Sequence, residues 1–226
     1  MSHLINIFLE PGKVFAELKE KPTFIVPLLL VMAATMVMTF MYFMKVDSAW
    51  FIDHTLLASG KEMSAAEMAQ AKSFMPGAKM MGYFSVVSIP IGTAVIVTLV
   101  ALYYLLAGKI TGSTIGFKHA VSLACWSSMP MLLGTIVMLV GVVMMSPQTS
   151  IESLGLTHLD PLLLQLPIDS PWKKLATSFD LLSFWNIFLV ALGWKTWGKT
   201  GWAEAIAVAL IPSIVIYGCF ALLALI

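Results

Sequence analysis

The sequence predicts an all-α integral membrane protein with five transmembrane helices and several short interfacial helices. The 226 residues are 59% hydrophobic with a mean hydropathy of +0.92, and only 11% are charged, less than half the share usual in soluble domains. Uncharged runs of about 20 residues recur, which is the length of helix that a bilayer core about 30 Å thick needs. These features exclude a water-soluble globule. Because the chain has no arginine and a formal net charge of +1, it also offers no basic surface for nucleic acid.

Five stretches have the length and composition of membrane spans, because a helix satisfies all its backbone polar groups internally. They are residues 23–44, 81–107, 126–145, 175–194 and 205–226, within a single transmembrane domain covering residues 1–226. Four of them carry no charge. The fourth contains Asp180 and Asn186, but the aromatic-rich run after Asp180 suits a membrane better than water.

The distribution of lysine predicts the orientation of the chain. Five spans place the termini on opposite faces of the membrane. With the N-terminus inside, the inner segments are residues 1–22, 108–118 and 195–204, and these short segments contain seven lysines. The other six lysines are spread over longer loops, where the positive-inside rule has less force. We therefore expect a cytoplasmic N-terminus and a periplasmic C-terminus.

Several short helices are predicted outside the spans. Pro11 suits the first position of a helix through Lys19, with Val14, Phe15 and Leu18 on one side. This helix is either a cytoplasmic docking element or a plain interfacial anchor.

Two further helices are expected in the loop after the first span. One covers residues 48–57 with Gly60 as its cap. The other opens on a capping box, Ser64 to Glu67, and ends near Met75.

The segment from Gly108 to Lys118 contains three glycines but is not a phosphate loop. It follows a transmembrane helix, whereas the Walker and dinucleotide motifs follow a strand. The glycines instead predict a tight turn. After it, a helix over residues 117–128 is expected to run along the interface before Pro130 leads into the third span.

Three polar residues form a candidate intramembrane site: Asp180, Asn186 and Glu204. Buried polar groups of this kind either hydrogen-bond neighbouring helices or line a transport pathway. We expect Asn186 to bond another helix, and Glu204 to favour the positive N-terminus of the last span. No catalytic, cofactor or metal site is expected, because the two cysteines lie singly in apolar stretches and neither HExxH nor GxSxG is present.

The motifs and their order resemble the bacterial branch of the Ypt-interacting protein (Yip) family. The similar segments are Phe8-Leu9-Glu10-Pro11 with Val14, Phe15 and Leu18, Lys21-Pro22, Lys109-Ile110-Thr111-Gly112 with Phe117-Lys118, Ser127-Ser128-Met129-Pro130, Asp180-Leu181-Leu182, Asn186 and Gly193-Trp194-Lys195. The resemblance implies a multi-span protein of the bacterial inner membrane with a cytoplasmic N-terminus. Eukaryotic relatives bind Rab-type GTPases and influence membrane shape, but this chain lacks their long N-terminal domain.

The expected function is therefore that of a non-enzymatic membrane-organising or partner-binding protein, as the resemblance implies. Its partners would be membrane lipids and other membrane proteins or itself. The candidate cytoplasmic contact surface consists of Phe8, Pro11, Phe15, Lys109, Gly112, Phe117 and Lys118. The alternative is a small transporter or channel with a polar site near Asp180 and Asn186.

Overall fold

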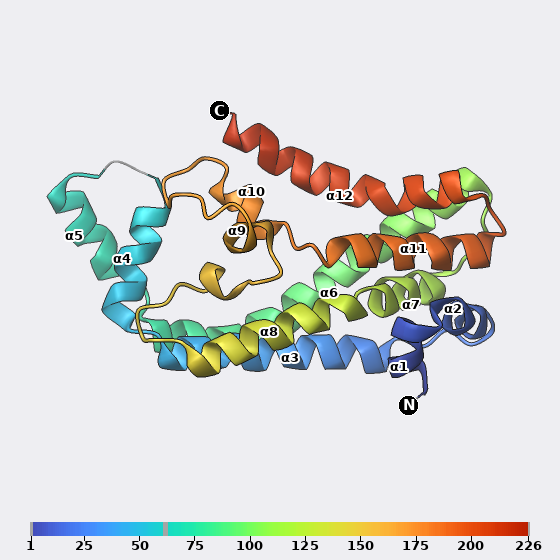
Figure 1. Ribbon diagram of the computed structural model, residues 1–226, viewed down its shortest axis with the longest axis horizontal. Helices are drawn as coiled ribbons and strands as arrows, with labels where there is room; N and C mark the ends of the chain where they lie inside the picture. The colour runs from blue at the N-terminus through green and yellow to red at the C-terminus, as the bar shows by residue number, and fades with distance from the viewer. Residues whose placement is uncertain (1, 61–62, 226) are drawn as a thin grey trace. The chain divides into compact units, whose positions relative to one another are not determined.

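A computed structural model describes residues 2–60 and 63–225, which form helices and no β-strand (Figure 1). The helices are α1 (Ser2–Leu9), α2 (Pro11–Glu20), α3 (Ile25–Lys45), α4 (Ser48–Ala58), α5 (Ala65–Phe74), α6 (Ala78–Thr111), α7 (Phe117–Ser127), α8 (Met129–Met144), the 3-10 helix η1 (Glu152–Leu154), α9 (Leu159–Leu162), α10 (Lys173–Ser178), α11 (Ser183–Gly198) and α12 (Trp202–Ala224). Ile226, the last residue of the fifth predicted span, lies outside the described residues.

Four stretches of helix in the described chain are long and apolar enough to cross a membrane. They are α3, α6, the continuous run Phe117–Met144 formed by α7 and α8, and α12. They correspond to the first, second, third and fifth predicted spans, and the predicted all-α membrane fold is confirmed. The second span is longer than predicted, since α6 has 34 residues and continues through Pro90.

The fourth predicted span, residues 175–194, is wrong in its bounds. The chain forms α10, leaves the helical conformation at Phe179, and then forms α11, which has 16 residues. A helix of that length extends about 24 Å. The break has a tertiary cause: the Phe179 carbonyl accepts a hydrogen bond of 2.8 Å from the Leu159 amide, and His158 and Asp180 form a β-bridge. This pairing with the preceding loop takes up backbone groups that a continuous helix would use.

The helix predicted to lie in the interface over residues 117–128 is instead part of the protein core. Most of α7 is buried: Ala120, Val121, Ser122, Leu123, Cys125, Trp126 and Ser127. The Ser122 hydroxyl and the Trp126 indole N–H both donate to the Thr23 carbonyl, at 2.8 and 2.7 Å. These bonds satisfy the Ser122 hydroxyl and the Trp126 indole N–H within the protein, and the burial of the surrounding residues places this part of α7 in the core.

The chain divides into two compact units. Unit 1 comprises Met1–Ala33, Pro90–Leu133 and Leu181–Cys219, and unit 2 comprises Ala34–Ile89, Gly134–Asp180 and Phe220–Ile226. Each unit has a hydrophobic cluster of its own.

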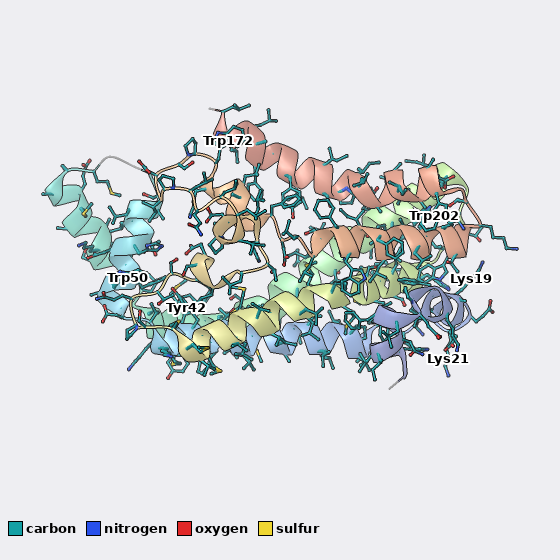
Figure 2. The ribbon with its side chains drawn as sticks, viewed as in Figure 1. Lys19, Lys21, Tyr42, Trp50, Trp172 and Trp202 are labelled. Atoms are coloured by element: carbon teal, nitrogen blue, oxygen red, sulfur yellow. The ribbon has the colours of Figure 1, made fainter. Side chains whose placement is uncertain are left out.

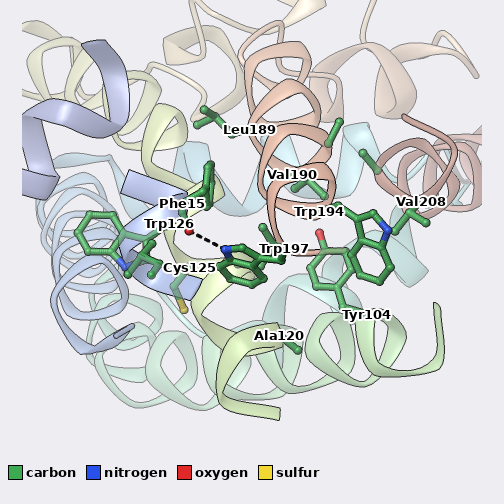
Figure 3. Packing of buried hydrophobic residues seen from close by; sticks show 14 of the residues in the cluster. Phe15, Tyr104, Ala120, Cys125, Trp126, Leu189, Val190, Trp194, Trp197 and Val208 are labelled. Carbon is green, nitrogen blue, oxygen red and sulfur yellow. Dashed lines mark hydrogen bonds between the residues drawn. The ribbon is translucent and has the colours of Figure 1, made fainter. Parts of the chain in front are cut away.

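The core of unit 1 forms where α2 packs against α7 and α11. Pro11 begins α2 as predicted, and Val14, Phe15 and Leu18 are the buried residues of that helix. The Phe15 carbonyl accepts a 2.7 Å hydrogen bond from the Trp197 indole N–H, drawn as a dashed line in Figure 3. The apolar side of α2 therefore faces protein.

Close approach in this core depends on Gly193 of α11. An ideal Cβ added to Gly193 would lie 2.5 Å from Leu123 Cδ1 and 3.0 Å from two ring atoms of Phe15. Since Leu123 and Phe15 are both fully buried, neither has free space into which to move. A larger residue at position 193 would separate α11 from α2 and α7.

Unit 2 is held by contacts between α3, α8 and the loops that follow them. The Tyr42 hydroxyl donates to the Thr149 carbonyl at 3.2 Å, and the Lys45 ammonium donates to the Val143 carbonyl at 2.7 Å. Both loop helices follow the prediction. Gly60 adopts φ +66° after α4, and the Ser64–Glu67 capping box begins α5. Hydrogen bonds from the Ser64 side chain and backbone lower the pKa of the Glu67 carboxyl.

Replacing Gly193 by valine is expected to destabilise unit 1, because overpacking a filled core costs about 1–3 kcal/mol. The apparent melting temperature of the detergent-solubilised protein should fall. Gly218→Val is the matched control, since a Cβ at Gly218 meets nothing within 4 Å. Equal melting temperatures for Gly193→Val and the control would contradict the packing described here.

Candidate functional site

The three lysine-bearing segments predicted to share the inner face of the membrane lie together in unit 1. The Lys19 ammonium, labelled in Figure 2, donates to the Trp197 carbonyl at the end of α11 at 3.0 Å. The Lys19 carbonyl lies 3.0 Å from His119 Nε2 of α7. The turn between α6 and α7 also touches α11, because a Cβ on Gly198 would lie 3.4 Å from the Ser113 hydroxyl. The N-terminal helices, the 108–118 turn and the end of α11 therefore form one surface.

The residues of the predicted contact surface differ in their exposure. Lys109, Gly112, Phe117 and Lys118 of the turn are exposed. Gly112 has φ +76°, a conformation that glycine adopts without steric cost. The Ser113 amide donates to the Gly108 carbonyl at 2.8 Å and closes the predicted turn.

The N-terminal residues of the predicted contact surface are more buried than those of the turn. Phe8 and Pro11 are partly buried, and the Phe8 ring packs edge-on against Trp185 with 5.5 Å between ring centroids. Phe15 is fully buried and its ring packs against Trp197. Phe15 is therefore a core residue and not part of a contact surface, because the same apolar side of α2 that suggested docking is covered by α11.

The three polar residues predicted inside the membrane have separate partners. The Asn186 amide donates to the Ser127 carbonyl at 2.8 Å, so α11 is bonded to α7 as expected. Glu204 accepts a long hydrogen bond of 3.5 Å from the Trp194 indole N–H. In unit 2, Asp180 Oδ2 lies 3.7 Å from His158 Nε2. Each contact ties two segments of one unit together.

Unit 2 contains an ion pair formed by Lys173 and the buried carboxylate of Asp160. Asp160 is only 1% exposed, and its two carboxylate oxygens accept from the Leu166 amide and the Lys173 ammonium, both at 2.6 Å. Lys173 also donates to the Leu166 carbonyl at 2.9 Å. The buried carboxylate is thus paired and hydrogen-bonded, which is the condition for burying a charge at tolerable cost.

A cavity of about 600 Å³ lies beside this ion pair, within the range of small-molecule sites. Its ionisable lining residues are His54, Glu152, Asp160, Lys173 and Lys174. His54 of α4 and Glu152 of η1 lie 3.6 Å apart. Since almost 100 residues separate them in the chain, no local motif signals this juxtaposition.

Removing one member of the Asp160–Lys173 pair is expected to be costly. Lys173→Met leaves a buried carboxylate without its counter-charge, which costs on the order of 3 kcal/mol. The double variant Asp160→Asn, Lys173→Met removes both charges and should recover most of the loss. Melting temperatures of the three proteins measure this coupling, and a double variant no more stable than Lys173→Met would contradict it.

Comparison with known proteins places the chain in a family. The model of the Yip1 domain matches residues 5–223. No curated protein and no solved structure gives a significant match. The match extends over nearly the whole chain and overlaps each of the four helices in the described residues that are long and apolar enough to span a membrane. The chain is thus a multi-pass membrane protein that belongs to the Yip family.

Proposed function

We propose that this chain is a non-enzymatic protein of the bacterial inner membrane that organises the membrane by binding partners at the turn between α6 and α7. Its partners are other membrane proteins or a second copy of itself, together with membrane lipids. The observation that carries this proposal is that the exposed turn, residues 108–118, is held in place by contacts with the packed core of unit 1. Membership of the Yip family supports a role without catalysis.

The chemistry of the turn suits a partner at the membrane surface. Lys109 and Lys118 supply two exposed cations, while Ile110 and Phe117 are 77% and 49% exposed. Cations next to apolar side chains match both anionic lipid headgroups and acidic residues at the edge of an apolar helix. Because the turn rests on the core of unit 1, little conformational entropy is lost when a partner binds.

The contacts within unit 1 also support a cytoplasmic N-terminus and a periplasmic C-terminus. Residues 13–21, 109–118 and 195–199 contain seven lysines and lie on one surface through the Lys19, His119 and Trp197 contacts. Clustered lysines in short segments mark the cytoplasmic face. From that face, α12 is long enough to reach the other side.

The same contacts support a fifth passage through the membrane. The chain leaves this face through α7 and α8, yet Trp197 is again in contact with Phe15. A return of the segment between Met144 and Trp197 across the bilayer accounts for this contact, although α11 itself has only 16 residues. Five passages leave the two termini on opposite faces.

Reporter fusions test this topology. Alkaline phosphatase fused after Ile226 should be active and green fluorescent protein at the same site should be dark, because phosphatase folds outside the cytoplasm. Fusions after Lys118 serve as the control and should show the reverse pattern. A fluorescent fusion after Ile226 would mean an even number of passages.

Photocrosslinking tests the contact surface. A benzophenone amino acid at Phe117 should give a discrete adduct in native membranes, and Lys109→Gln with Lys118→Gln should weaken it several-fold because both cations are lost. Phe74 on α5 is the matched control, as it is an exposed phenylalanine, 79% accessible, in unit 2. The same adducts at both positions, or an adduct unaffected by the lysine substitutions, would contradict the proposal.

A further inference from the structure

The cavity of unit 2 combines positive and negative groups that the proposed contact surface does not use. It is lined by residues of α4, η1, α9, α10 and the loops between them. Asp160 and Lys173 neutralise each other at 2.6 Å. The charged groups left to recognise a ligand are therefore the remaining N–H groups of the two lysines and the carboxylate of Glu152.

The cationic part of the cavity comes from two adjacent lysines. An ammonium carries three N–H donors, and Lys173 uses two of them on Asp160 and Leu166, which leaves one for a ligand. Lys174 also lines the cavity, with its ammonium 5.8 Å from the centre of the Phe220 ring. Among the described residues Lys174 takes part in no carboxylate ion pair. Its positive charge is thus available to an anionic group such as phosphate.

The remaining polar lining accepts hydrogen bonds. The hydroxyls of Thr55, Ser153 and Thr177 donate their protons to the carbonyls of residues 51, 150 and 173. Their oxygen lone pairs are the groups left for a ligand. Glu152 contributes a carboxylate whose side chain is 42% exposed and 3.6 Å from His54. This part of the lining suits a ligand that carries N–H donors and a positive charge.

We propose that the cavity binds a phosphoethanolamine group, a phosphate joined to a primary ammonium. The phosphate lies against Lys174 and the free N–H of Lys173, and the ammonium lies against Glu152 and the hydroxyl oxygens. A quaternary ammonium has no N–H to donate, so the site discriminates against phosphocholine. A phosphoglycerol headgroup lacks the positive charge that Glu152 recognises.

The surroundings of the cavity favour a membrane lipid as the source of this group. Leu162, Leu163 and Leu164 directly follow the lining residue Pro161 and are 44%, 66% and 48% exposed. Three consecutive exposed leucines offer an apolar surface to acyl chains beside a polar cavity. The proposal is independent of the contact surface on the α6–α7 turn, which belongs to unit 1.

Native mass spectrometry of the full chain in mild detergent tests the proposal with three lipids of identical acyl chains. The protein should retain phosphatidylethanolamine roughly tenfold more than phosphatidylcholine or phosphatidylglycerol, as expected for one charge-assisted hydrogen bond. Glu152→Gln should abolish this preference, and Lys174→Gln should lower retention of all three lipids. Glu67→Gln and Lys79→Gln are the matched controls, because both residues are exposed and neither lines the cavity.

Calorimetry with soluble phosphoethanolamine and with inorganic phosphate distinguishes a lipid from a free small molecule. Binding of soluble phosphoethanolamine that Glu152→Gln removes supports recognition of the headgroup alone. Binding of the lipid only, with the same dependence on Glu152, supports recognition that includes the acyl chains. Equal retention of the three lipids by the unaltered protein, or an unchanged preference in a Glu152→Gln protein of normal melting temperature, would overturn the proposal.

Discussion

The close approach of α2 and α7 to α11 at Gly193 is the constraint on which unit 1 depends. The side chains of Phe15 and Leu123 occupy the space that a Cβ at position 193 would need. The Trp197–Phe15 hydrogen bond fixes the register of α2 against α11. This packing brings residues near the N-terminus into contact with residues almost 180 positions later. The surface that carries the α6–α7 turn forms because α2, α7 and α11 pack together in this way.

Local and compositional signals predicted much of the fold. The lengths of the apolar runs predicted four of the spans correctly, since a helix in a bilayer satisfies its backbone polar groups within itself. Caps were also predictable: Pro11, Gly60 and the Ser64–Glu67 box each act over a few residues. The fourth span and α7 were misjudged because their structure depends on partners distant in sequence. Phe179 pairs with Leu159 and leaves the helix, and Ser122 and Trp126 bond to Thr23.

In the candidate sites, too, local signals were predictable from the sequence, whereas contacts between distant segments were not. Exposure of Lys109 and Lys118 follows from their place in a glycine-rich turn, and the bond from Asn186 to α7 follows from the cost of an unpaired amide in a membrane. Phe15 could not be assigned correctly, because an apolar helix side has the same pattern whether it meets lipid, a partner or its own chain. The cavity of unit 2 could not be predicted from the sequence either, since His54 meets Glu152 only through the folding of two separate loops.

The length of α11 has a consequence for the fifth passage proposed above. Its 16 residues extend about 24 Å, some 6 Å less than an average hydrocarbon core. Such hydrophobic mismatch is relieved when the adjacent bilayer thins, at a cost that grows with each ångström. In the proposed fifth passage, the free energy of α11 in the membrane therefore depends on bilayer thickness and is lower where the lipid layer is thin.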